Sequence, residues 1–356
     1  MNNTLVIKIG TNVILGNGSQ VNFSILKNIA AQICKLKEKG YKIILVSSGA
    51  VGASKELVQK SQEKHSISFL AAIGQTVLIN HYQNIFKQKN QIIAQVLLTG
   101  DDFLNRQRYN FIYETLTELL KNNIIPIINE NDVVTRDYWG FGENDFLAAI
   151  TAININADKI IFLTNVDGIY DKNPKEKDAK LISNIKNVNE IDVAKTTSTF
   201  GKGGMASKVN AANLAANAGI EGFVINGLKE KNLEKLILDT SKIGTRIKAS
   251  SKKLNQKRGW LFIGKLRPGK IFIDRGAGEA IKSGNSLLAI GVKEARGNFH
   301  NKDVVSVLDE KNNIIGYGTV NYDFEKLKKI KGMEKNEIKK HYEREIIHRD
   351  NLTILK

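Results

Sequence analysis

Residues 4–12 read Thr-Leu-Val-Ile-Lys-Ile-Gly-Thr-Asn, an apolar run that ends in a lysine, a glycine and two polar residues. This composition predicts a buried β-strand that ends in a turn. Residues 23–39 carry apolar side chains every three or four positions, which indicates an amphipathic helix, and Gly40 would end it. Residues 42–46 predict a second strand. A strand, a helix and a strand in this order are typical of the βαβ unit of parallel sheets.

The same alternation of strand and helix patterns continues to about residue 250. Further strands are predicted at 92–98, 124–128, 160–163 and 222–226, and helices after residue 49, around 68–87 and at 101–122, 145–157 and 208–218. The polar stretch 171–186 indicates a loop or a hairpin. The pattern predicts an α/β fold, a three-layer α/β/α sandwich in which helices cover both faces of a mostly parallel sheet.

The pattern changes after about residue 250. Residues 246–258 are polar and predict a linker, and the remainder contains short apolar segments separated by glycines and turn residues. Strands are predicted at 269–274, 286–291, 304–308, 314–320 and 351–355, and helices at 322–330 and 336–342. We therefore expect two domains, a large α/β domain at 1–250 and a small β-rich domain at 259–356.

Composition narrows the class of protein. The chain has 356 residues, 42% of them hydrophobic, but no apolar run approaches the ~18–20 residues that a membrane-spanning helix needs. The N-terminus enters a strand pattern directly, without the layout of a signal peptide. The single cysteine, Cys34, excludes an intramolecular disulfide and a cysteine-based zinc site, and the five histidines have no metal-binding spacing. We expect a cytoplasmic protein with no membrane association.

The net charge is +17, and it is unevenly distributed. Residues 251–356 contain 23 Lys and Arg against 13 Asp and Glu, whereas residues 1–250 contain 30 against 23. One interpretation is a C-terminal domain that binds nucleic acid by neutralising phosphates. The other is a general enrichment in Lys, Asn and Ile, which runs along the whole chain. A positive field would also favour an anionic nucleotide and an acidic substrate.

Four polar residues lie at or just past predicted strand ends: Lys8, Ser48, Asn129 and Thr164. Because ligands of parallel sheets bind outside the carboxyl ends of the strands, these residues should meet at one edge. A lysine there can neutralise a phosphoryl group during its transfer. The segment Ser47-Ser48-Gly49 leads into a helix, whose first N–H groups can bind a carboxylate or a phosphate.

Later segments add acids and a glycine-rich loop. Residues 129–132 (Asn-Glu-Asn-Asp) and 143–145 (Glu-Asn-Asp) flank an aromatic stretch at 138–141, and they could bind an ammonium group, orient lysines or hold Mg²⁺. Residues 201–204 (Gly-Lys-Gly-Gly) precede a helix with Lys208, as in loops that cradle phosphates. The spacing matches neither the Walker A motif nor Gly-x-Gly-x-x-Gly. Taken singly, each segment is better explained by a strand end, a helix cap or a surface loop than by a functional site.

Taken together and in this order, the segments resemble the amino-acid kinase family. The resemblance is carried by residues 6–11 (Val-Ile-Lys-Ile-Gly-Thr), 46–51 (Val-Ser-Ser-Gly-Ala-Val), 126–132 (Pro-Ile-Ile-Asn-Glu-Asn-Asp), 163–170 (Leu-Thr-Asn-Val-Asp-Gly-Ile-Tyr) and 203–208 (Gly-Gly-Met-Ala-Ser-Lys). In the C-terminal part, Gly276-Ala277, Ser286-Leu287-Leu288, Gly297-Asn298-Phe299 and Ile347-His348-Arg349-Asp350 resemble a PUA domain. The resemblance thus extends over nearly the whole chain, with the kinase domain at 1–250 and the PUA domain at 259–356.

The resemblance implies ATP-dependent phosphorylation of the side-chain carboxylate of L-glutamate. The products would be ADP and L-glutamyl 5-phosphate, in the first step of proline biosynthesis. Lys8 and Lys208 would neutralise the transferring phosphoryl group, and Asp145 would orient both lysines. Glutamate would be bound by Ser48, Asp132 and Asn144, and ATP by Lys8, Thr164, Asn165, Gly203, Gly204, Met205, Ala206, Ser207 and Lys208. Mg²⁺ would accompany ATP, and no protein side chain is assigned to it.

Two positions depart from the family pattern. Asn165 stands where the family commonly has Asp, so it keeps hydrogen-bonding groups but has no charge, and Glu143 stands where many members have Asp. The resemblance also implies a homo-oligomer, either a dimer or a tetramer, with proline as a feedback inhibitor and glutamyl-phosphate reductase as a partner. For the basic PUA domain it leaves a regulatory or assembly role and RNA binding open.

Two other functions stay open at this point. One is another carboxylate or carbamate kinase of the same fold, although an acceptor such as N-acetylglutamate has no ammonium group for Asp132. The other is an RNA-binding protein that has reused a kinase-like domain. The combination of Lys8, Asp145 and Lys208 speaks against the second, since RNA binding does not require a carboxylate between two lysines.

Overall fold

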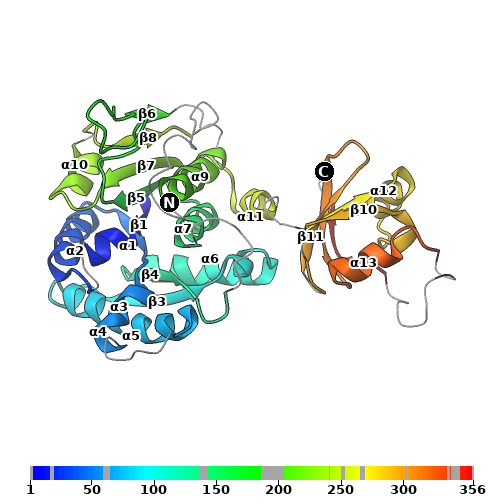
Figure 1. The fold of residues 1–356 in the computed structure, drawn as a ribbon, viewed down its shortest axis with the longest axis horizontal. Helices are drawn as coiled ribbons and strands as arrows, with labels where there is room; N and C mark the ends of the chain where they lie inside the picture. The colour runs from blue at the N-terminus through cyan, green and yellow to red at the C-terminus, as the bar shows by residue number, and fades with distance from the viewer. Residues whose placement is uncertain are drawn as a thin grey trace. The chain divides into compact units, whose positions relative to one another are not determined.

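The structure is a computed structural model that describes residues 3–16, 20–58, 65–135, 143–185, 204–239, 241–249, 253–264, 269–297, 299–301, 303–334, 337 and 345–354. The chain divides into two compact units, Met1–Trp260 and Leu261–Lys356 (Figure 1). Each unit is described by itself. Within the described residues, no helix is both long enough and apolar enough to cross a membrane.

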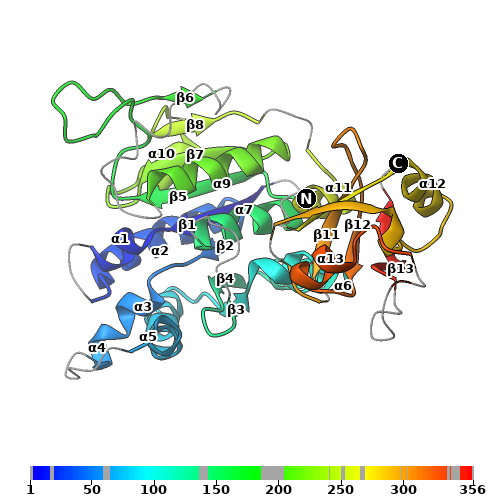
Figure 2. The same ribbon diagram turned by 45° about the vertical axis from the view of Figure 1, so that its right-hand side comes forward.

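The first unit is built on an eight-stranded sheet. Its strands are β1 (Thr4–Ile9), β2 (Lys42–Val46), β3 (Ile93–Leu98), β4 (Ile125–Glu130), β5 (Lys159–Thr164), β6 (Asn184–Ile185), β7 (Glu221–Asn226) and β8 (Thr245–Ile247). Their order is β3-β4-β2-β1-β5-β7-β8-β6, which Figure 2 shows from bottom to top. Every neighbouring pair is parallel except β7 and β8. The predicted mostly parallel sheet is confirmed.

Helices cover both faces of this sheet (Figure 1). They are α1 (Thr11–Leu15), α2 (Phe23–Glu38), α3 (Ala50–Ala53), α4 (Lys55–Val58), α5 (Ile67–Lys87), α6 (Arg106–Lys121), α7 (Glu143–Ile155), α9 (Met205–Asn217) and α10 (Asn232–Leu238), with a short 3-10 turn η1 (Gly100–Phe103). Helices α2, α5 and α10 share one apolar core with the sheet. The opposite face packs against α6, α7 and α9. The predicted three-layer α/β/α sandwich is therefore confirmed.

The central strand β1 shows how the layers place the site. All six of its residues are buried. Leu5, Ile7 and Ile9 belong to the core shared with α2, α5 and α10. Since successive side chains of a strand point to opposite faces, Val6 and Lys8 point toward the α7 layer. The sequence alternation thus directs a lysine into the interior at the carboxyl end of the strand.

Helix boundaries follow local capping, and one of them corrects a prediction. The predicted helix at 101–122 is divided in two. Asp102 closes a capping box with Thr99 that forms η1, and Asn105 then accepts hydrogen bonds from Gln107 N (3.0 Å) and Arg108 N (3.1 Å) to begin α6. Two good N-cap residues in close succession favour two helical starts over one continuous helix.

The second unit contains a five-stranded sheet in the order β10-β9-β11-β12-β13. Its strands are β9 (Lys270–Ile273), β10 (Val292–Arg296), β11 (Val304–Leu308), β12 (Ile314–Val320) and β13 (Ile347–Ile354), and its helices are α12 (Arg275–Lys282) and α13 (Phe324–Ile330), with a 3-10 turn η3 (Ala289–Gly291). The unit has its own apolar core. The predicted strand at 286–291 is wrong, because Leu287 makes only an isolated bridge and η3 follows. Apart from Glu337, the predicted helix at 336–342 falls outside the described residues.

The stretch 246–258 is only partly a linker. Strand β8 ends at Ile247, and helix α11 (Gln256–Gly264) begins inside the predicted linker. The indole Nε1 of Trp260 donates to Leu104 O (3.2 Å), and the guanidinium of Arg106 lies 5.1 Å from its ring centroid. Of the polar residues in the first turn of α11, Gln256 is half-buried and Arg258 is exposed, and Trp260 follows them with its ring against Leu104 and Arg106. The boundaries 1–250 and 259–356 stay predictions.

Candidate active site

A cleft of about 570 Å³ opens at the carboxyl ends of β1, β2, β4 and β5. The predicted site residues that line it are Lys8, Ser48, Asp132, Asn144, Asp145, Thr164, Asn165, Gly204, Met205 and Lys208. Ala206 and Ser207 lie on the first turn of α9 but are not among its lining residues. Gly203, the rest of the loop at 201–203 and the aromatic stretch 138–141 lie outside the described residues. The structure therefore brings most of the predicted residues to one edge of the sheet.

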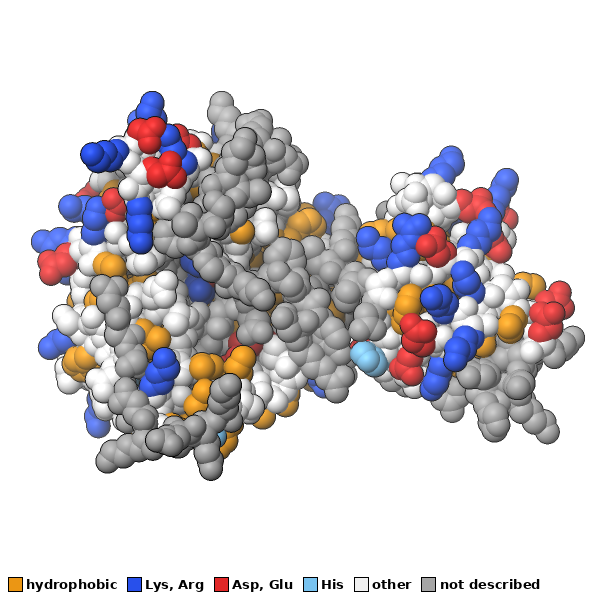
Figure 3. Space-filling view, in the orientation of Figure 1, with side chains coloured by type: hydrophobic (Ala, Val, Ile, Leu, Met, Phe, Trp, Pro, Cys, Tyr) orange, Lys and Arg blue, Asp and Glu red, His pale blue; other side chains and the backbone are white. Residues whose placement is uncertain are grey.

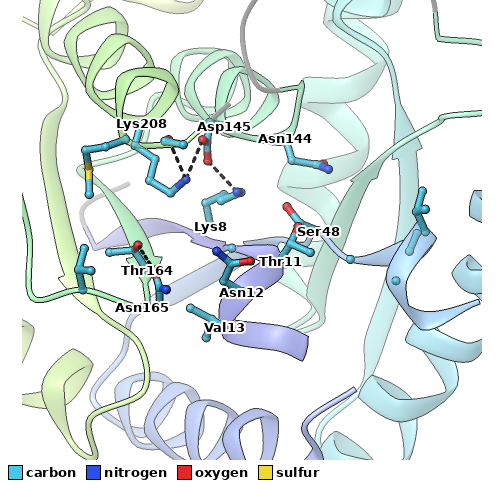
Figure 4. Close-up of a pocket in the computed structure, with 18 of the residues that line it drawn as sticks. Lys8, Thr11, Asn12, Val13, Ser48, Asn144, Asp145, Thr164, Asn165 and Lys208 are labelled. Atoms are coloured by element: carbon cyan, nitrogen blue, oxygen red, sulfur yellow. Dashed lines mark hydrogen bonds and ion pairs between the residues drawn. The ribbon is translucent and has the colours of Figure 1, made fainter. Parts of the chain in front are cut away.

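The centre of the cleft is one carboxylate between two ammonium groups (Figure 4). Lys8 Nζ lies 2.7 Å from Asp145 Oδ1, and Lys208 Nζ donates to Asp145 Oδ2 at 3.1 Å. Lys208 Nζ also donates to Gly204 O (3.3 Å). The Asp145 side chain is 2% exposed, Lys8 6% and Lys208 12%. Three elements, β1, α7 and α9, thus supply one buried cluster with an excess of one positive charge.

The electrostatics of this cluster follow from its burial. Burial by itself raises the pKa of Asp145, but attraction to Lys8 and Lys208 outweighs it and leaves this pKa below its ordinary value. Burial lowers the pKa of Lys8, and repulsion from Lys208 lowers it further, while Asp145 acts in the opposite direction. At neutral pH the carboxylate is ionised and keeps both lysine side chains aimed into the cleft.

Gly10 lets the end of β1 lie close to the main chain of β5 beneath the cleft. Gly10 N donates to Leu163 O (3.1 Å), which fastens the end of β1 to β5. A Cβ at position 10 would lie 3.1 Å from the same oxygen. Helix α1 begins directly afterwards, and Thr11, Asn12 and Val13 line the cleft. Sequence reasoning missed these three residues, although their position just after a strand end was the available signal.

The Ser48 loop is held from behind. Ser47 is fully buried, and its hydroxyl lies 2.9 Å from the hydroxyl of Tyr82, a buried residue of α5. Gly49 has a φ of +93°, a left-handed conformation that favours glycine. Helix α3 then packs so tightly on α5 that a Cβ at Gly74 would lie 1.7 Å from Ala50 O. Ser48 therefore faces the cleft from a rigid support.

Asp132 and Asn144 line one end of the cleft, and their side chains suit an amino acid ligand. Glu130 N donates to Asn144 Oδ1 (3.1 Å) and to Asn129 Oδ1 (3.0 Å). Because its oxygen is engaged, Asn144 is left with its Nδ2 group as a donor for an anion. Asp132 is half-buried, and burial raises its pKa against the opposing effect of its own backbone N–H. A carboxylate beside amide donors can bind the ammonium and carboxylate groups of an amino acid.

The other end of the cleft is formed by the segment after β5. Thr164 is buried, and its hydroxyl donates to Asn165 Oδ1 (3.4 Å). The exposed side chain of Asn165 lines the cleft, as do Tyr170, Lys172 and Pro174. Sequence reasoning missed the last two because the polar stretch 171–186 indicated only a loop or hairpin. The structure shows a single antiparallel bridge between Tyr170 and Leu181 there, with Lys172 paired to Asp178.

The chain is similar to known proteins over its whole length. A model of the amino acid kinase family matches residues 3–226, and one of the PUA domain matches residues 269–342. A protein of Thermoanaerobacter sp. (strain X514) named glutamate 5-kinase is 40% identical, and the alignment covers 99% of this chain and 97% of that protein. A protein of Nostoc punctiforme with the same name is 38% identical, with complete coverage of both chains.

Solved structures support the fold of the first unit. The UMP kinase of Bacillus anthracis has a TM-score of 0.51 and 17% identity, covering 70% of this chain and 96% of that one. The carbamate kinase of Giardia lamblia has a TM-score of 0.50 and 21% identity, covering 69% and 98%. At this identity the two structures bear on the fold alone. Together with the matched family model and the full-length relatives, they lead to one conclusion: the chain belongs to the amino acid kinase family.

Proposed function

We propose that this chain transfers the γ-phosphoryl group of ATP to the side-chain carboxylate of L-glutamate, the first step of proline biosynthesis. Relatives at 38–40% identity over the whole chain carry the name glutamate 5-kinase. The observation that carries the chemistry is the cluster of Lys8, Asp145 and Lys208 at the carboxyl edge of the sheet. Phosphoryl transfer depends on such positioning and charge neutralisation.

The step needs no proton transfer. A carboxylate oxygen of glutamate forms a bond to the γ-phosphorus, and the bond from that phosphorus to the β–γ bridging oxygen breaks, leaving its electron pair on ADP. The acceptor carboxyl group is already ionised at neutral pH, with an ordinary pKa of about 4.3. This agrees with a cleft whose described residues include no histidine. Lys8 and Lys208 stabilise the negative charge on the phosphoryl oxygens as it moves.

The end of the cleft that contains Asp132 and Asn144, called the acceptor end from here on, fits an amino acid with two carboxylates. In our assignment Asp132 binds the ammonium group of glutamate, and Ser48 and Asn144 donate to its carboxylates. The Asn144 assignment is supported by the hydrogen bond that occupies its oxygen. The half-buried position of Asp132 strengthens its attraction for a cation relative to a fully solvated carboxylate.

The nucleotide end is assigned to Thr164, Asn165 and the start of α9, where Gly204, Met205, Ala206, Ser207 and Lys208 follow Gly203. Helix α9 has thirteen residues, so its N-terminus presents N–H groups and a positive dipole end suited to a phosphate. Asn165 has no charge, so in our proposal it makes a hydrogen bond to the nucleotide rather than binding a metal ion.

The Mg²⁺ that ATP requires is a separate question. Among the residues that the structure describes, no three His, Cys, Asp or Glu side chains lie close enough to hold a metal ion together. Asp145 is committed to two lysines. We propose that Mg²⁺ arrives bound to phosphate oxygens and water, as is common for this ion, and we assign no step to it.

The partners implied by the family resemblance remain proposals. They are a dimeric or tetrameric assembly, inhibition by proline, transfer of the unstable product to a glutamyl-phosphate reductase, and a cytoplasmic location. For the PUA domain we propose regulation or assembly before RNA binding. In Figure 3 its basic side chains are interspersed with acidic ones, and ion pairs such as Lys293–Glu310, Arg296–Glu294 and Arg275–Glu279 neutralise part of the positive charge.

The proposal is tested by ADP release from ATP and Mg²⁺ in the absence of RNA. We expect release to depend on L-glutamate. ATP binding without RNA together with glutamate-dependent release would exclude the RNA-binding alternative. A folded protein that releases no ADP with glutamate would contradict the proposed function.

A further inference from the structure

Gln75 contacts the acceptor end of the cleft without lining it. It lies on α5, is half-buried, and lines a second cavity of about 510 Å³. This cavity shares Asp132 with the cleft, so the segment after β4 separates the two. Gln75 is thus a polar group placed directly behind the residues assigned to glutamate.

Both functional groups of the Gln75 carboxamide form hydrogen bonds with the last two residues of β4. Its Nε2 donates to Glu130 O (3.3 Å), and its Oε1 accepts from Asn129 Nδ2 (3.2 Å). Asn129 Oδ1 accepts in turn from Glu130 N (3.0 Å). Because the donor and acceptor ends of a carboxamide differ, Gln75 determines the orientation of the Asn129 side-chain amide.

The same contacts extend to Asn144. Glu130 N donates to Asn144 Oδ1 as well as to Asn129 Oδ1. Gln75 holds the carbonyl group of Glu130, so it fixes the residue whose N–H orients both asparagines. Asn129 and Asn144 both line the cleft. One glutamine therefore stands behind two carboxamides that face the acceptor.

We propose that Gln75 is a positioning residue for the acceptor: it orients Asn129 and Asn144 so that their amide groups meet the carboxylates of the substrate. This inference rests on the proposed function, because it assumes an anionic acceptor at this end of the cleft. Helix α5 is held to the sheet by buried apolar residues, among them Leu78, Ile85 and Phe86. Loss of two hydrogen bonds at Gln75 should therefore disturb the acceptor end locally and leave the fold intact.

The test is the replacement Gln75→Met, which keeps length and removes both hydrogen bonds. We expect the KM for L-glutamate to rise about tenfold, since two hydrogen bonds that hold the acceptor end are lost, with the KM for ATP changed by less than about twofold. The matched control is Gln83→Met, two turns further along α5, exposed and lining the same cavity. Both KM values should stay unchanged in that variant.

A double-mutant cycle tests the route through Asn129. In an Asn129→Ala background, Gln75→Met should raise the KM for glutamate by clearly less than it does alone. An undiminished effect would show that Gln75 does not act through Asn129. Thermal unfolding of each variant shows whether the fold is kept, and Gln75→Leu, which also removes both hydrogen bonds, replaces Gln75→Met if that variant does not fold.

The outcomes separate this inference from the proposed function. A folded wild-type protein that forms no glutamyl phosphate would contradict the function itself. An active wild type with an unchanged glutamate KM in Gln75→Met would overturn the positioning role alone. Equal rises of both KM values would also overturn it, because they would indicate a general structural defect.

Discussion

Lys8 and Lys208 bind opposite oxygens of the same carboxylate, at 2.7 Å and 3.1 Å from Asp145. Lys8 is the penultimate residue of the central strand β1, whereas Lys208 lies in the first turn of α9. Asp145, on α7, holds two ammonium groups together that would otherwise repel each other. The arrangement concentrates positive charge where a phosphoryl group in transit would place its oxygens.

Removing one of these charges should abolish most turnover. For Lys208→Ala we expect kcat to fall about 10²–10³-fold, the range typical of losing a donor aimed at the transition state. Thermal unfolding should change little, since Asp145 keeps Lys8 as a partner. The control is Lys35→Ala, which breaks an exposed pair with Glu234 and should leave kcat unchanged. Full activity in Lys208→Ala would exclude its assigned role.

As the pH is raised, the enzyme should lose activity at a lower pH than the ordinary pKa of lysine predicts. Burial and Lys208 lower the pKa of Lys8, so Lys8 loses its proton, and kcat falls, below the ordinary pKa of about 10.4. Asp145 raises the pKa of Lys8, so Asp145→Asn should move this alkaline limb to still lower pH. A pH–rate profile of both proteins measures the shift, with circular dichroism to verify the fold. A limb that stays in place in Asp145→Asn would contradict the coupling.

The charge of Asp132 should contribute to the binding of glutamate and not to that of ATP. Asp132→Asn keeps the shape and removes the charge, so the KM for L-glutamate should rise about tenfold or more while the KM for ATP stays the same. In the wild type, burial raises the pKa of Asp132. As the pH falls, Asp132 should therefore take up a proton, and the affinity for glutamate should weaken, at a pH higher than the ordinary aspartate pKa of about 3.9. Steady-state kinetics with each substrate varied decides the matter. An unchanged glutamate KM would remove Asp132 from the acceptor site.

The contact between α3 and α5 makes a prediction about stability. A Cβ at Gly74 would lie 1.7 Å from Ala50 O, so Gly74→Ala must push α3 away from α5. We expect the free energy of unfolding to fall by about 1–3 kcal/mol, with a weaker affinity for glutamate because the Ser48 loop precedes α3. In Gly278→Ala the nearest atoms lie 3.9 Å away, so this control should be neutral or slightly stabilising. Equal stabilities of the two variants would contradict the close approach.

The fold was predictable because its elements follow local patterns. The alternation around residues 4–46 identifies a βαβ unit, and the rule on strand ends brings Lys8, Ser48 and Thr164 to one edge. The roles of Asp145 and Lys208 came from the family resemblance instead. Their mutual geometry depends on how α7 and α9 pack, which no local pattern records.

Other features could not be found in the sequence for the same reason. The contact of Ser47 with Tyr82 and that of Gln75 with Asn129 join residues distant in the chain, through the packing of α5 on the sheet. Polar side chains on a long amphipathic helix read as its solvated face. The linker prediction at 246–258 was wrong at its two ends, because β8 continues to Ile247 and α11 begins at Gln256. The hydrogen bond from Trp260 to Leu104 O, which holds the start of α11, again joins residues distant in the chain.

The most direct test of the central claim is hydroxamate formation from ATP, Mg²⁺ and hydroxylamine with L-glutamate, L-aspartate or N-acetyl-L-glutamate as acceptor. Hydroxylamine traps an acyl phosphate, so the assay reports the bond that the transfer creates. We expect hydroxamate with L-glutamate only, since Asp132 requires an ammonium group and the spacing of the acceptor groups a particular chain length. Hydroxamate from N-acetyl-L-glutamate at an equal rate, or none from L-glutamate in a folded protein, would contradict the account.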